Sequence, residues 1–82
     1  MAADPDLLAL GGEVRRCREA RQLSQEELAD RSGLHRNYVG GIERGERNVG
    51  VKSLFRLAAA LDMTPSALLA DVAPTARDAA TD

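Results

Sequence analysis

Two short apolar-patterned segments separated by a glycine turn constrain this sequence more than any other feature. The first, Gln25–Arg31, follows a serine with N-cap chemistry, Ser24, and Glu27 three residues later completes a capping box. Gly33 then supplies the left-handed backbone that a tight turn after a helix needs. The second segment, Arg36–Arg44, is also predicted to be helical.

The second segment has two faces. Val39 and Ile42 are predicted to point inward, and the outward side carries Arg36, Asn37, Tyr38 and Gly41. Two short helices joined by a glycine-containing turn form a helix-turn-helix, a motif whose second helix enters the major groove of DNA.

These residues also resemble a known family. Leu23–Ala29 reads Leu-Ser-Gln-Glu-Glu-Leu-Ala, and Gly33–Asn48 reads Gly-Leu-His-Arg-Asn-Tyr-Val-Gly-Gly-Ile-Glu-Arg-Gly-Glu-Arg-Asn. Together they resemble the Cro/lambda-repressor-like, or Xre-type, helix-turn-helix family, and most of all the controller proteins of restriction-modification systems. The resemblance covers roughly Val14–Leu69. It implies an all-α, compact five-helix DNA-binding domain.

The remaining apolar patterns complete the expected domain. A first helix is predicted over about Leu7–Arg21, with Asp6 as a candidate cap, or only from Glu13, because two glycines in a row at 11 and 12 cost about 1 kcal/mol each. A fourth helix is predicted over about Val51–Leu61, and a fifth starts at Thr64-Pro65. We therefore divide the chain into a flexible lead (1–6), one domain (7–72) and a disordered tail (73–82).

Composition narrows the functional classes. The single cysteine, Cys17, excludes an internal disulfide, fits a reducing cytoplasm and is most simply a small buried hydrophobe. With His35 as the single histidine, no metal-ligand set is expected, and neither a cofactor nor catalysis is indicated. No apolar run approaches the length of a membrane span.

Charge alone leaves DNA binding undecided. The net charge of −2 is not the basic balance expected of a nucleic-acid binder. Between Arg31 and Arg56, however, six basic and two acidic residues give a local +4, which leaves −6 for the rest of the chain. A local basic face attracts a polyanion because salt screens each charge beyond about 10 Å.

The candidate base-reading residues lie on the outward side of the second helix of the motif. Arginine pairs with guanine and asparagine with adenine, so Arg36 and Asn37 are the primary candidates. Tyr38 either stacks on DNA or lies back on the domain. The resemblance places a base-reading or phosphate-binding side chain where this chain has Gly41, so one specificity contact is in doubt there.

Phosphate contacts are expected from helix starts, amides and basic side chains. The resemblance implies a phosphate-clamping role for Gln25 and a second clamp around Arg47. The full candidate set is Ser24, Gln25, His35, Arg44, Arg47, Asn48, Lys52 and Ser53. The resemblance also implies an ion pair between Arg18 and Glu43 that locks the recognition helix to the scaffold.

The leading hypothesis is a transcriptional regulator that binds palindromic double-stranded DNA as a homodimer, without a small-molecule effector. A restriction-modification controller is its sharpest form; a stand-alone repressor and an antitoxin are alternatives. The rival class is a protein-interaction module that has lost DNA binding, which the acidic composition favours. The expected dimer interface consists of Phe55, Leu68, Leu69 and Val72, with one of the two adjacent leucines sealing the monomer.

Overall fold

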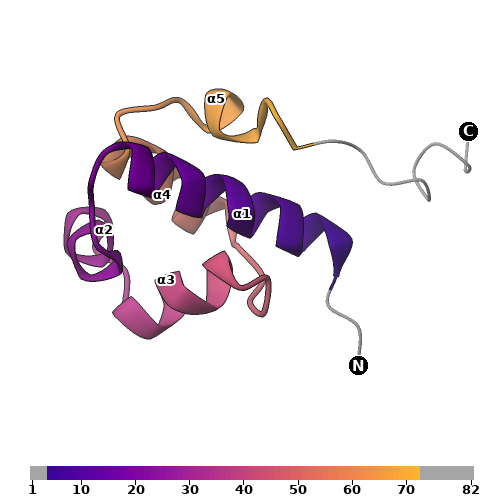
Figure 1. Cartoon of the computed structure of the whole chain (residues 1–82), viewed down its shortest axis with the longest axis horizontal. Coiled ribbons are helices and arrows are strands. Elements are labelled where there is room, and N and C mark those ends of the chain that lie inside the picture. Colours follow the sequence, from indigo (N-terminus) through magenta and orange to yellow (C-terminus); the bar gives the residue numbers. More distant parts are fainter. Residues whose placement is uncertain (1–3, 73–82) are drawn as a thin grey trace, which may run out of the picture.

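The computed structural model describes residues 4–72 and folds this range into five helices. They are α1 (Pro5–Ala20), α2 (Gln25–Ser32), α3 (Arg36–Glu43), α4 (Val51–Ala60) and α5 (Pro65–Leu69). No strand occurs between residues 4 and 72, so the predicted all-α architecture is confirmed. In Figure 1, α1 crosses the molecule between α3 and α5, with α4 behind it. The expected tail, 73–82, lies outside the described residues.

The start of α1 differs from the prediction. The helix begins at Pro5, because Asp4 rather than Asp6 is the N-cap. The Asp4 carboxylate accepts hydrogen bonds from the backbone N–H groups of Asp6 at 2.8 Å and Leu7 at 3.4 Å. Proline at the first helical position loses no hydrogen bond there. Residues 5 and 6, which we assigned to the lead, therefore belong to the first helix.

Gly11 explains why α1 continues through two glycines. A Cβ atom at Gly11 would collide with the backbone oxygen of Ile42 and would lie 2.8 Å from that of Glu43. At Gly12, nothing lies within 4 Å of such an atom. Gly11 thus lets the backbones of α1 and α3 approach closely, and the alternative start at Glu13 was wrong.

The core is aliphatic, as the shortage of aromatic residues requires. Its largest fully buried side chains come from all five helices and the turn after α4: Val14, Leu28, Val39, Ile42, Leu57, Leu61 and Leu68. Cys17 is 2% exposed and belongs to this cluster, so its assignment as a small buried hydrophobe is confirmed.

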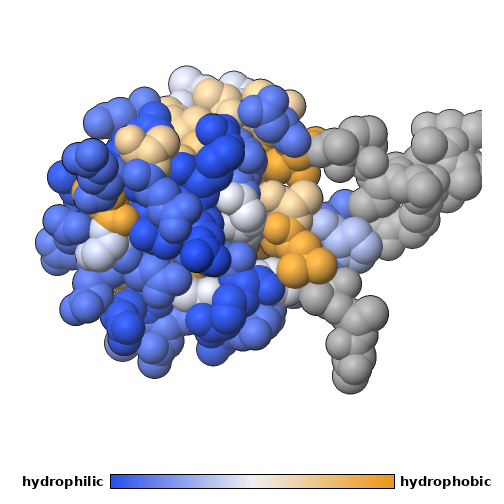
Figure 2. Space-filling view, viewed as in Figure 1, coloured by the Kyte–Doolittle hydropathy of each residue, from blue (hydrophilic) through white to orange (hydrophobic). Residues whose placement is uncertain are grey.

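The two adjacent leucines of α5 have different environments. Leu68 is fully buried in the core, whereas Leu69 is 38% exposed. Leu68 is therefore the leucine that seals the monomer, as expected of one of the two, and Leu69 is left as the candidate for the dimer interface. Phe55 and Val51 on α4 are exposed, as is Leu8 on α1. Figure 2 shows one face of the molecule, which is mainly hydrophilic over α2 and α3 and more hydrophobic toward α5 and the start of α1.

Two helix ends carry unfavourable backbone geometry. Gln22 after α1 and Asp62 after α4 have φ of 59° and 56°, in the left-handed region where glycine is normally found. In both places the next residue donates its N–H to a carbonyl five residues back: Leu23 to Arg18 at 3.1 Å and Met63 to Ala58 at 2.8 Å. These bonds define Schellman ends, which point the chain toward the following helix.

Within residues 4–72, none of the helices combines the length and the hydropathy that a membrane span requires.

Candidate nucleic-acid interface

The interface begins with the start of α2. The Ser24 hydroxyl accepts the Glu27 N–H at 3.0 Å, and the Glu27 carboxylate accepts the Ser24 N–H at 2.8 Å. This is the predicted capping box. The Ser24 backbone N–H, together with its side chain, holds the pKa of the Glu27 carboxyl below its usual value. The Ser24 hydroxyl oxygen is thus engaged in the helix start.

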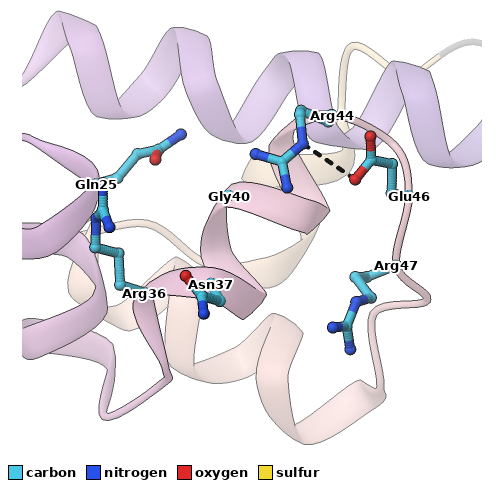
Figure 3. Close-up of a pocket in the computed structure, with 7 residues that line it drawn as sticks. All are labelled: Gln25, Arg36, Asn37, Gly40, Arg44, Glu46 and Arg47. Atoms are coloured by element: carbon cyan, nitrogen blue, oxygen red, sulfur yellow. Dashed lines mark hydrogen bonds and ion pairs between the residues drawn. The ribbon is translucent and has the colours of Figure 1, made fainter.

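A polar pocket lies between the start of α2, the outer side of α3 and the loop that follows it. It has a volume of about 220 Å³ and is lined by Gln25, Arg36, Asn37, Gly40, Arg44, Glu46 and Arg47. Figure 3 shows these residues on their three segments. Five of them are residues predicted to contact DNA. Three arginines and two amides around one hollow supply donors suited to phosphates and base edges.

Beneath this pocket, Glu43 joins three helices. Arg18 of α1 donates from Nε to Glu43 Oε2 at 2.7 Å and from Nη2 to Oε1 at 3.0 Å, which is the expected ion pair. Gln25 of α2 donates its amide to the same carboxylate at 3.0 Å. The Glu43 side chain is 2% exposed and that of Arg18 is 11% exposed. Hydrogen bonding to Glu43 raises the pKa of the Arg18 guanidinium.

The hydrogen bonds to Glu43 fix the orientation of the Gln25 side chain at the pocket. Its amide nitrogen is held by Glu43, so the side chain cannot rotate freely. Arg18 also donates to the backbone oxygen of Leu23 at 2.8 Å, which ties the turn before α2 to α1. The position of the recognition helix relative to the start of α2 is therefore set by hydrogen bonds from α1 and α2.

The two glycines of α3 make room for arginine side chains. A Cβ atom at Gly40 would lie 3.1 Å from Arg44 Nη1, and one at Gly41 would lie 2.6 Å from Arg47 Cγ. Gly41 was predicted to face outward, but it is buried. Its lack of a side chain leaves the space in which the stem of Arg47 packs on α3.

Tyr38 lies back on the domain. The side chain is half-buried against the core, and its hydroxyl donates to the backbone oxygen of Asn48 at 2.9 Å. Of the two alternatives for Tyr38, the structure has the one in which the ring packs on its own chain. The hydrogen bond also fastens the loop between α3 and α4 to the recognition helix.

The other predicted phosphate contacts lie outside the pocket. His35 is the exposed N-cap residue of α3 and makes no side-chain capping bond, while Lys52 is exposed and Ser53 half-buried at the start of α4. Glu46 is the residue that sequence reasoning missed. The only sequence feature that could have indicated its role was the spacing of a carboxylate two positions after Arg44, within a segment that is basic overall. Among residues 4–72, no group of three or more potential metal ligands occurs.

Comparison with known proteins places this arrangement in a family. The model of a helix-turn-helix family matches residues 14–68. The chain belongs to this helix-turn-helix family. The match spans the second half of α1, both helices of the motif, α4 and most of α5.

Several of the similar proteins are restriction-modification controller or control proteins, the class that the sequence motif indicated. Control protein C.SmaI of Serratia marcescens is 50% identical over 60 residues, which are 73% of this chain and 71% of that protein. The crystal structure of the restriction-modification controller protein C.AhdI from Aeromonas hydrophila has a TM-score of 0.76 and 52% identity, covering 77% of this chain and 96% of that one.

A third helix-turn-helix relative was solved with DNA. The restriction-modification controller protein C.Esp1396I, a tetramer in complex with its natural 35-base-pair operator, has a TM-score of 0.76 and 30% identity. The match covers 82% of this chain and 88% of that chain.

Proposed function

We propose that this protein is a transcriptional regulator that binds operator DNA as a homodimer and controls restriction-modification genes. The observation that carries the proposal is the polar pocket at the exposed start of α3, which Arg36, Asn37 and Gln25 line. The kinship with controller proteins, one of them solved on its operator, supports the same function.

Each contact has a distinct role in this proposal. Arg36 and Asn37 read base edges in the major groove, where a bidentate pair contributes about 1–3 kcal/mol of discrimination. Arg47 and Arg44 bind phosphates together with the backbone N–H groups at the uncapped start of α3. Arg18 and Glu43 do not touch DNA, but hold α3 in position.

Dimerisation follows from the size of the site. One domain reads only a few base pairs, and a two-fold dimer on half-sites about 34–36 Å apart doubles the sequence that is read. Val51 and Phe55 on α4 and Leu69 on α5 are large apolar side chains exposed to solvent, and a second copy of the chain could cover them. We propose these side chains, together with the half-buried Val72, as the interface.

Selection of bound sites from a random DNA pool tests the DNA-binding part. The expected product is a palindromic consensus with two half-sites. Arg36→Ala should relax preference at one base pair in each half-site, whereas a variant as selective as the wild type would remove Arg36 from the base-reading set.

The adjacent leucines provide a matched test of the interface. Leu69→Glu should give a folded monomer in sedimentation and circular dichroism, with weaker operator binding. Leu68→Glu places a charge in the core and should unfold the domain. A Leu69→Glu protein that remains dimeric would place the interface elsewhere.

A further inference from the structure

We propose that Glu46 is an internal competitor for the DNA backbone. Its carboxylate neutralises Arg44 in the free protein and so lowers the affinity for every duplex, whatever its sequence. The proposal rests on the DNA binding proposed above, and it concerns how strongly the pocket attracts phosphate.

The geometry joins the two side chains inside the pocket. Arg44 Nε donates to Glu46 Oε1 at 3.1 Å. The guanidinium folds back along α3, with Nη1 3.1 Å from the place where a Cβ at Gly40 would stand. Figure 3 shows the pair at the edge of the pocket. Among residues 4–72, Glu46 is the one hydrogen-bond partner of this guanidinium, whose terminal nitrogens remain available to phosphate.

The carboxylate is not explained by folding. The Arg44 and Glu46 side chains are 58% and 60% exposed, so water screens the pair and it stabilises the fold little. Glu43 is different, because its side chain is buried and carries three hydrogen bonds from two helices. Glu46 instead reduces the charge of the pocket-lining residues from +3 to +2.

The physical consequence is a weaker attraction for phosphate. A phosphate that binds the free terminal nitrogens of Arg44 meets a guanidinium whose charge is already offset by the Glu46 carboxylate at Nε. The neutral pair therefore contributes little to counterion release from DNA, whereas a free arginine contributes about 0.9 to the slope of log K against log salt. Relative to 1 M salt, a slope of about 0.9 makes the affinity for DNA up to about 8-fold higher at 0.1 M salt.

The test is a cycle of Glu46→Gln and Arg44→Gln in the full chain. Fluorescence anisotropy with a labelled duplex of arbitrary sequence measures the affinity between about 50 and 200 mM salt. Glu46→Gln should bind about 3–8-fold more tightly at 0.1 M salt, with a slope steeper by up to about 0.9. In the Arg44→Gln background the same change should affect the affinity much less, because the guanidinium that Glu46 neutralises is no longer present.

Glu19→Gln is the matched control. It removes a carboxylate from a similarly exposed ion pair, Arg15–Glu19 at 3.3 Å, which lies on α1 outside the pocket. Because Glu19 Oε2 also lies 4.0 Å from Arg18 Nη2, circular dichroism has to show that this variant keeps the wild-type fold. Its affinity and slope should change less than those of Glu46→Gln.

Four outcomes would overturn the proposal. An affinity of Glu46→Gln equal to that of the wild type would mean that the carboxylate does not compete with DNA. A gain in affinity that persists without Arg44 would mean that Glu46 acts only through the general field of the molecule. A loss of affinity in Glu46→Gln would mean that the carboxylate holds Arg44 in place for DNA. A wild-type chain that binds no duplex at all would overturn the proposed function as well, which separates the two failures.

Discussion

Removal of Arg18 should destabilise the domain because it leaves a buried carboxylate without its cation. In Arg18→Met, the Glu43 side chain, 2% exposed, keeps only the Gln25 amide, and the Leu23 oxygen loses its donor. Breaking a buried ion pair costs about 3–5 kcal/mol. We expect about 3 kcal/mol, because Arg18 is 11% exposed and water can reach the cavity edge. The free energy of unfolding expected for a chain of 82 residues is about 4–12 kcal/mol.

Urea unfolding followed by circular dichroism measures this loss. The double variant Arg18→Met, Glu43→Leu should recover most of it, since replacing both partners of a buried pair by apolar residues is often neutral. Arg15→Met, which breaks an exposed pair on the same helix, should stay within about 0.5 kcal/mol of wild type. An Arg18→Met protein within about 1 kcal/mol of wild type, or a double variant as unstable as the sum of the single ones, would refute the reasoning.

Three further predictions concern local structure. Gln22→Gly should stabilise the domain by about 0.5–1 kcal/mol, because it removes the strain of a left-handed backbone at φ 59°. As a control in the same urea titration, Ala59→Gly inside α4 should destabilise the domain by about 1 kcal/mol. Gly50→Ser should raise the melting temperature more than Gly50→Ala, because α4 has no side-chain cap and only serine adds a capping oxygen. Nothing lies within 4 Å of a Cβ at this position, so both side chains fit. Equal gains in melting temperature would mean that no cap forms. Because the folded pKa of Glu27 is depressed, its contribution to stability is present above about pH 4.5 and is lost as pH falls through the lower folded pKa. The difference in unfolding free energy between wild type and Glu27→Gln should therefore shrink on acidification, and a difference independent of pH would contradict the capping role.

Local chemistry made much of the fold predictable. The Ser24–Glu27 capping box, the left-handed Gly33 and the Thr64-Pro65 helix start all operate within four residues of chain, and each has its expected geometry. The helix-turn-helix was equally visible, because the alternation of buried and exposed side chains in short helices follows from their period.

The positions that were misjudged or left open depend on contacts between distant segments. Gly11 looked like a helix breaker, because the backbone of α3 that requires it lies thirty residues away in sequence. Leu68 and Leu69 could not be separated without the tilt of α5 on the core. Gly41 seemed to be a missing contact, since nothing in the sequence shows that the stem of Arg47 occupies that space.

The recognition helix is a poor helix by its own sequence. It has eight residues, two of them glycine, and neither a side-chain cap nor an acidic residue in its first turn. Its stability therefore comes from the scaffold: buried Val39 and Ile42, the close approach at Gly11, and the hydrogen bonds of Glu43. A substitution at Gly11 or Arg18 should weaken DNA binding by displacing α3, although neither residue lines the pocket. Loss of binding alone therefore does not identify a DNA contact in this protein, and the salt dependence or the base preference has to change as well.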